Sequence, residues 1–186
     1  AINRALELIP IEDRAPEKLS VYNATILLNT ATTLKAIGRA AEGLPLYELV
    51  LSVYEKELES DDKRKAGLYN NYALALTDAK RYDEATKLYN KALAIMSTAP
   101  DRYPDCAVTY VNMAHLIETQ KGLDQGESEI FACLDKAEEL LYNPATPRNS
   151  YFAYVCSKCA PSFGYFGYFI TAKELTALSE EIYARA

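Results

Sequence analysis

One short pattern occurs three times in this chain, at nearly the same interval. A large apolar residue stands two positions before an asparagine, and an alanine stands two positions after it. The asparagines are Asn29, Asn71 and Asn112, spaced 42 and 41 residues apart. Self-similarity at a period of this size is typical of proteins in which equivalent units stack on one another. The pattern therefore predicts an array of repeats.

Each repeat has the pattern of two helices joined by a short break. Apolar residues three and four apart form one helical stripe. The breaks are expected at 36–39, 79–81 and 121–126, and about four extra residues are placed in the third turn. Small residues such as Ala73 and Ala85 let the two helices approach to about 8–10 Å, while Tyr69, Tyr82 and Tyr89 fill the space between hairpins. A single hairpin cannot bury its apolar face, so the units must stack.

The segment 66–97 resembles a tetratricopeptide repeat (TPR). The residues on that family's signature spacing are Tyr69, Ala73, Leu76, Tyr82, Ala85, Tyr89, Ala92 and Leu93. Agreement is lower in 24–57 and lowest in 107–141, and the period of about 42 residues is similar to that of kinesin light chain repeats. The resemblance implies an all-α fold, a right-handed α-solenoid of stacked antiparallel helix hairpins (a TPR-like superhelix). It also implies a function in binding other proteins.

The chain ends are interpreted as parts of the same array, a single domain over 1–186. Ala5, Leu6 and Pro10 match the close of a second helix, so 1–10 is expected to be helix B of a truncated repeat. Either a first helix lies upstream in a longer protein, or the chain is a fragment. Segment 148–186 is expected to be a degenerate or capping hairpin, with helices at 148–160 and 166–185 broken at 161–164. Terminal repeats are usually atypical because they cap the stack.

The last hairpin is rich in aromatic residues: Tyr151, Phe152, Tyr154, Phe163, Tyr165, Phe166, Tyr168 and Phe169. They form either a capping core with some exposed tyrosines or a hydrophobic surface that docks another domain or a second copy. A homodimer is also possible through 1–9, where Ile2, Leu6 and Ile9 share one side of the expected helix.

The resemblance implies that the first helix of each repeat lines a concave groove in which ligands lie. An asparagine amide both donates and accepts, so it can pair with any peptide backbone. Helices about 10 Å apart would place an amide at every third residue of an extended peptide, which rises ~3.3 Å per residue. Alternatively, the asparagines hydrogen-bond to neighbouring helices and fix the register of the stack. The candidate peptide-binding residues are Asn29, Asn70, Asn71, Asn112, Thr32, Lys35, Leu74, Asp78 and His115.

Two narrower functions are not expected of this groove. The family's two-carboxylate clamp needs a lysine and an asparagine where Leu28 and Thr32 stand, so binding of chaperone tails is not predicted. His115 is the only histidine, and its expected helical neighbours, such as Glu118, include no nucleophile. Cys106 is over two turns away, which argues against a metal site. His115 is therefore expected to line the groove.

Composition excludes several other classes of protein. A net charge of −6, from 20 basic and 26 acidic residues, disfavours nucleic-acid binding. No apolar run approaches the ~18 residues of a membrane span, and no signal peptide is visible, so a cytoplasmic protein is expected. The four cysteines, with Cys156 and Cys159 in a C-x-x-C, are expected to be buried thiols because no second pair completes a zinc site.

These observations favour a protein-protein interaction scaffold that binds an extended peptide or a partner protein. Catalysis, a cofactor and a bound metal are not expected, because the chain has no phosphate-binding loop, nucleophile elbow or metal-ligand spacing. The alternative is a peptide-sensing repeat domain of a larger bacterial-type regulator, with a DNA-binding or effector domain upstream.

Overall fold

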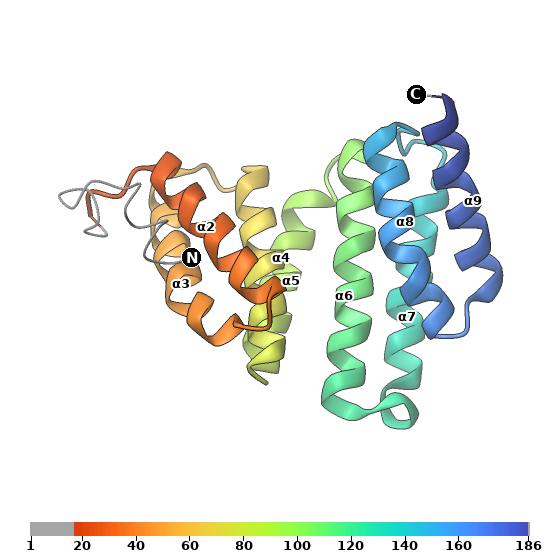
Figure 1. Cartoon of the computed structure of the whole chain (residues 1–186), viewed down its shortest axis with the longest axis horizontal. Helices are drawn as coiled ribbons and strands as arrows, with labels where there is room; N and C mark the ends of the chain where they lie inside the picture. Colours follow the sequence, from red (N-terminus) through yellow and green to blue (C-terminus); the bar gives the residue numbers. More distant parts are fainter. Residues whose placement is uncertain (1–16, 186) are drawn as a thin grey trace. The chain divides into compact units, whose positions relative to one another are not determined.

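The computed structural model describes residues 17–185, which are helical apart from short connections and contain no strand (Figure 1). The helices are α2 (Val21–Ala36), α3 (Ala40–Glu57), α4 (Lys63–Asp78), α5 (Tyr82–Met96), η2 (Pro100–Arg102), α6 (Tyr103–Lys121), α7 (Leu123–Tyr142), α8 (Ser150–Tyr165) and α9 (Phe169–Arg185). Consecutive helices pair as the antiparallel hairpins α2/α3, α4/α5, α6/α7 and α8/α9. The prediction of an all-α chain of helix hairpins is confirmed.

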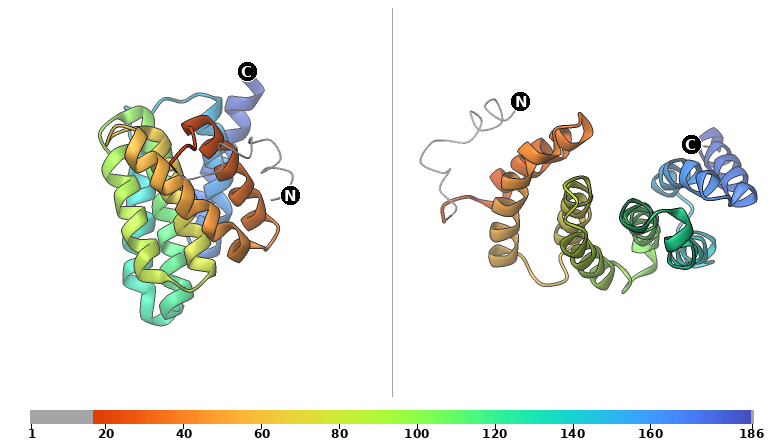
Figure 2. Two further views of the ribbon diagram at one scale, coloured as in Figure 1. Left: turned by 90° about the vertical axis from the view of Figure 1, so that its left-hand side faces the viewer. Right: turned by 90° about the horizontal axis from the view of Figure 1, so that it is seen from below.

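The described residues form two compact units, one ending at Ile95 and the other beginning at Met96. The first unit holds α2/α3 and α4/α5, and the second holds α6/α7 and α8/α9, shown from two further sides in Figure 2. The helix predicted at 1–10 lies outside the described residues.

Small residues and stacked tyrosines hold the first unit together. Helix α3 packs against both α2 and α4. A Cβ atom at the buried Gly43 would lie only 3.1 Å from the carbonyl oxygen of Ala31, so α2 and α3 approach with almost no side chain between them. The rings of Tyr47 on α3 and Tyr72 on α4 stack with centroids 5.3 Å apart. The sequence therefore places a small residue between helices and large residues between hairpins, as predicted.

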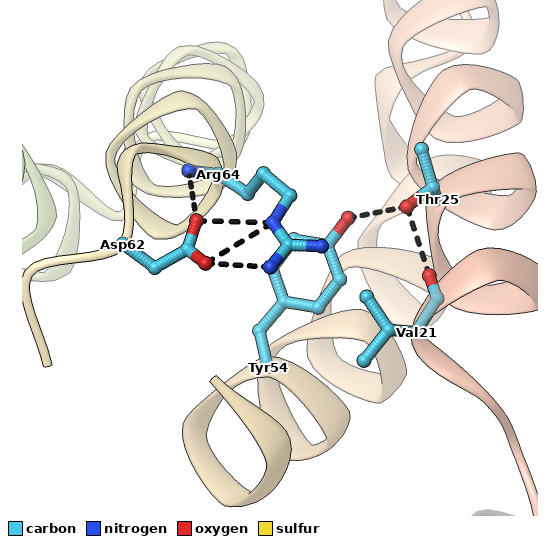
Figure 3. Close-up of polar contacts among 5 residues, drawn as sticks. All are labelled: Val21, Thr25, Tyr54, Asp62 and Arg64. Atoms are coloured by element: carbon cyan, nitrogen blue, oxygen red, sulfur yellow. Dashed lines mark hydrogen bonds and ion pairs between the residues drawn. The ribbon is translucent and has the colours of Figure 1, made fainter. Parts of the chain in front are cut away.

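Polar side chains mark where helices begin. The Asp62 carboxylate accepts the backbone N–H of Arg64 at 2.8 Å at the start of α4, and the Arg64 guanidinium donates to the same carboxylate (Figure 3). Ser20 and Asn149 cap α2 and α8 in the same way. Each cap satisfies an N–H group that the first helical turn leaves without a backbone partner.

The expected helix break at 161–164 is wrong. Helix α8 continues through Pro161 to Tyr165, and the turn follows at 166–168. A proline removes one backbone hydrogen bond inside a helix, but Pro161 is exposed, so water can solvate the carbonyl that loses its partner. Gly167, with φ +90°, is the residue that lets the chain turn.

The prediction for the extra residues of the third hairpin is also wrong. They were expected in the turn, but only Gly122 separates α6 from α7. These helices have 19 and 20 residues, against 16 and 15 in α4 and α5. The insertion lengthens both helices because Gly122, at φ +79°, reverses the chain within a single residue.

The aromatic residues of the last hairpin divide between core and surface. Phe152 and Phe163 are fully buried in the second unit, whereas Tyr165 and Phe169 are 59% and 73% exposed. The hairpin therefore has the aromatic core of the first interpretation and also leaves aromatic surface, as the second requires.

Candidate functional site

The candidate site in the first unit is the solvent-facing surface of α2 and α4, two helices that contact each other. We call this surface the outer face of α2 and α4. Helix α2 buries Ala24, Leu27, Ala31 and Leu34 on one stripe, which leaves the opposite stripe to solvent. Asn29 lies on that opposite stripe and is exposed. Asn71 is half-buried on α4. The repeat pattern thus puts one asparagine on each of two neighbouring helices.

The side-chain amides of these two asparagines have no hydrogen-bond partner among residues 17–185. At Asn29, the Thr33 hydroxyl donates to the backbone oxygen and leaves the side chain untouched. Asn70 and Asn112, by contrast, each have an interaction within the chain. Within the described part of the chain, the four candidate asparagines therefore fall into two groups: Asn70 and Asn112 have interactions, and the side-chain amides of Asn29 and Asn71 have none.

Two threonines on α2 face the partner helix of their own hairpin. Thr25 shares a hydrogen bond of 2.7 Å with the Tyr54 hydroxyl and donates to the Val21 carbonyl (Figure 3). The Tyr47 hydroxyl donates to Thr32 at 3.3 Å. The half-buried Thr32 is thus already bonded to α3, which the sequence could not show because the bond depends on the hairpin geometry.

The remaining candidates of the first unit lie on the same two helices. Lys35 and Leu74 are half-buried, and Asp78 is exposed at the end of α4. Burial raises the pKa of Tyr47, and the negative charge of Asp78 adds to this effect. Besides the two amides, α2 and α4 therefore carry one candidate cation, one candidate anion and one candidate apolar side chain.

His115 lies in the second unit, where it joins α6 to α8. Its Nε2 is 2.9 Å from the Ser162 hydroxyl, and its Nδ1 is 3.3 Å from the Glu118 carboxylate. Its ring also packs on Phe166, with centroids 4.8 Å apart. Sequence reasoning missed Ser162 and Phe166 because they lie on another hairpin, and the chain carries no local signal that would reveal the pairing.

Ser162, His115 and Glu118 are ordered as in an acid–base relay, but the surroundings do not support acyl transfer. Such a site needs N–H groups aimed at the developing oxyanion. The N–H groups just after α8, those of Phe166, Gly167 and Tyr168, all donate to backbone carbonyls of α8. The contacts of His115 with Ser162 and Phe166 instead hold α6 against α8.

The cysteine prediction is confirmed. Cys106, Cys133, Cys156 and Cys159 are free and buried. Burial raises the pKa of Cys156 to about 11 and that of Cys159 to about 12, so thiolate is scarce at neutral pH. Within 17–185, no three His, Cys, Asp or Glu side chains are placed to hold a metal ion. No helix in this range is both long and apolar enough to cross a membrane.

The hairpins and the polar outer face of α2 and α4 define a helical-repeat protein. The chain belongs to the tetratricopeptide repeat family, because the model of that repeat matches residues 22–98 and 64–125. Members of this family are in general scaffolds for protein–protein interaction. The family suspected from the sequence is confirmed.

Solved structures support the same fold. A putative kinesin light chain from Podosopora anserina with nearly identical TPR-like repeats is 17% identical, with a TM-score of 0.56 over 88% of this chain and 76% of that chain. A point variant of that protein is 16% identical, with a TM-score of 0.59 over 99% and 82%. At these identities the likeness shows the fold alone, a TPR-like solenoid. A comparison with curated proteins gave no match.

Proposed function

We propose that this chain is a non-catalytic scaffold that binds an extended peptide, or an extended segment of a partner protein, across the outer face of α2 and α4. The observation that supports the proposal is the pair of amides on Asn29 and Asn71, on neighbouring helices, that no group among residues 17–185 occupies. In the tetratricopeptide repeat family the first helices of the hairpins usually line the ligand-binding groove, which supports this proposal.

The chemistry of the two amides suits a peptide backbone. Each can accept from one peptide N–H and donate to one C=O, with a net contribution of about 0.5–1.5 kcal/mol per hydrogen bond. Packed helices lie about 10 Å apart, which corresponds to about three residues of an extended chain. Lys35 on α2 and Asp78 on α4 stand six and seven residues after these asparagines and carry opposite charges. The partner would thus be held mainly through its backbone.

The alternative role of fixing the stacking register fits other asparagines better. A register contact requires a partner within the protein, and Asn70 and Asn112 each have an interaction there. The proposal therefore rests on Asn29 and Asn71. The ligand contacts predicted from the sequence for Asn112 and His115, which lie in the second unit, stay predictions.

The test begins with peptides selected against the wild-type chain from a random display library. Their affinities are then measured for the Asn29→Ala/Asn71→Ala variant. The control is Asn90→Ala, which removes an exposed asparagine from α5. We expect binding to weaken about tenfold or more in the double variant, in line with the loss of two backbone-directed hydrogen bonds, with the melting midpoint unchanged. Equal affinity for all three proteins would reject the site.

A further inference from the structure

The second unit has an unpartnered surface between its second helices, α7 and α9. On α7, Phe131, Asp135, Glu138 and Tyr142 are spaced four, three and four residues apart, so they share one face. Phe131 and Tyr142 are 39% and 37% exposed. Asp135, Glu138 and Tyr142, with Glu174 of α9, line a depression in the surface. We refer to it as the α7/α9 groove.

Three hydrogen bonds cross this groove, and each ends on a carboxylate. Tyr168 donates to Asp135, Thr171 donates to Glu138, and Tyr142 donates to Glu174, each at 2.5 Å. A hydroxyl donor holds a carboxylate in place without cancelling its charge. The groove therefore keeps three oriented negative charges.

In the first unit, carboxylates that accept hydrogen bonds from tyrosine hydroxyls have their charge neutralised by nearby cations. Glu48 and Glu55 on α3 accept hydrogen bonds from Tyr72 and Tyr69, as the groove carboxylates do from their hydroxyls. Arg81 lies 3.7 Å from Glu48, and Lys91 lies 3.2 Å from Glu55.

In the α7/α9 groove only Glu139 has a cation, Lys136 at 2.7 Å. Within residues 17–185, Asp135, Glu138 and Glu174 take part in no ion pair. The groove thus lacks the cations that the first unit supplies from its own chain.

Apolar surface borders these charges. Ile170 is 77% exposed and stands one turn before Glu174 on α9. The Phe131 ring packs edge-on against Tyr168, with centroids 5.8 Å apart, and remains partly open to solvent. A metal ion does not fit, because the described carboxylates are not grouped to coordinate one. The surface suits cations carried on apolar stems.

We propose that the α7/α9 groove docks a segment of a partner protein in which arginine or lysine residues flank an apolar side chain. The guanidinium or ammonium groups would pair with Asp135, Glu138 and Glu174, and arginine could do so through two parallel hydrogen bonds. The aliphatic stems and the central apolar residue would lie on Phe131, Tyr142 and Ile170. Charge complementarity selects this occupant. The site shares no helix with the proposed peptide site, so either can fail alone.

The test measures binding of a fluorescein-labelled synthetic peptide in which arginines alternate with leucine and phenylalanine. A second peptide replaces every arginine by citrulline, which keeps the shape and removes the charge. The groove variant is Asp135→Asn/Glu138→Gln/Glu174→Gln, whose amide oxygens can still accept the three hydroxyl hydrogen bonds. The control variant is Asp101→Asn/Glu129→Gln/Glu180→Gln, which removes the same charge from exposed positions elsewhere in the second unit.

We expect the arginine peptide to bind the wild-type and control proteins alike and the groove variant at least about tenfold more weakly, because charge pairs at the interface are lost. Phe131→Ala, which keeps every charge and truncates an exposed ring, should also weaken binding severalfold. No binding to the wild-type chain, equal loss in the groove and control variants, or equal binding of the citrulline peptide would each overturn the proposal.

Discussion

Two glycines of the first unit occupy helices but differ in what surrounds them. Gly43 is buried where α3 meets α2, with the Ala31 carbonyl oxygen 3.1 Å from where its Cβ would be. Gly67 lies on the exposed side of α4, with open space around that position. Gly43 stands 42 residues, one repeat, before Ala85, which is expected from the sequence to lie at a helix contact. The repeat spacing gives no reason for Gly67.

Alanine at these two positions should therefore have opposite effects. Gly43→Ala forces the backbones of α2 and α3 apart and should lower the free energy of unfolding by about 1–3 kcal/mol. Gly67→Ala should raise it by about 0.5–1 kcal/mol, because glycine is a poor helix former. Urea unfolding followed by circular dichroism measures both. A change of the same sign in both variants would contradict the helix contact described here.

The stabilisation that Asp62 gives to the start of α4 depends on pH. The side-chain hydrogen bond from Arg64 lowers the pKa of Asp62 to about 2, and the Arg64 backbone N–H contributes to the shift. An unfolded aspartate has a pKa near ~3.9. The folded pKa is the lower one, so the stabilisation is complete above about pH 4 and is lost as pH falls through about 2.

Asp62→Ala should consequently cost about 1 kcal/mol at pH 7, which is typical for loss of an N-cap. The difference between variant and wild type should shrink as pH falls from about 4 to about 2. Denaturant unfolding at a series of pH values measures it. A difference that stays constant over this range would show that the carboxylate charge does not act at the cap.

At the scale of elements, three of the hairpin turns share one hydrogen-bond pattern. The N–H groups of Gly38, Lys80 and Gly167 donate to the carbonyl three residues earlier, and the next N–H donates five residues back. The middle residue has a positive φ in each, and only in the second turn is it not glycine: Lys80 has φ +61°. A side chain at this conformation is strained, because Cβ crowds the backbone.

Lys80→Gly should therefore raise the free energy of unfolding by about 0.5–1 kcal/mol, and Gly38→Ala should lower it by a similar amount. Lys80→Ala is the control that removes the lysine side chain but keeps the Cβ, and it should have little effect. The comparison can be made by thermal or urea unfolding. Stabilisation by alanine equal to that by glycine would point to the charge of Lys80 and not to its backbone conformation.

The sequence predicted these elements well where the repeat is regular. The breaks at 36–39 and 79–81 fall where α2 and α4 end. The expectation failed at 161–164, since a proline was taken to end a helix that in fact passes through Pro161. Whether a proline is tolerated depends on what faces the freed carbonyl, and a one-dimensional pattern does not contain that information.

Across the whole molecule, the four cysteines lie in the second unit, so their reactivity gives information about that unit alone. All of them lie beyond Met96, in α6, α7 and α8, and all are buried. Their accessibility to a thiol reagent therefore measures opening of the second unit.

We expect all four thiols to react with Ellman's reagent at pH 8 at least about a hundredfold more slowly in native buffer than in denaturing urea, because burial excludes the reagent and suppresses the thiolate. Raising the urea concentration should expose the four together. Rapid reaction of two thiols, with formation of a disulfide between Cys156 and Cys159, would show a redox pair instead.

The candidate site could be predicted from the sequence only in part, because a repeat pattern does not record contacts between residues far apart in the chain. The repeat spacing selected Asn29, Asn71 and Asn112, and the family resemblance suggested that the helices carrying them line a groove. The spacing could not separate the first two from Asn70 and Asn112, which interact within the chain, nor could it show that His115 is bonded to Ser162. These distinctions depend on contacts between residues far apart in sequence, which a repeat pattern does not encode.

The proposed function requires the outer face of α2 and α4 to hold an extended peptide backbone. Its most direct test is an NMR titration of the ¹⁵N-labelled chain with a selected peptide, following the side-chain amide signals of the asparagines. We expect large shifts for Asn29 and Asn71, with little change for Asn90 on α5. Shifts confined to the second unit, or to Asn90 and the exposed residues of α3 and α5, would contradict it.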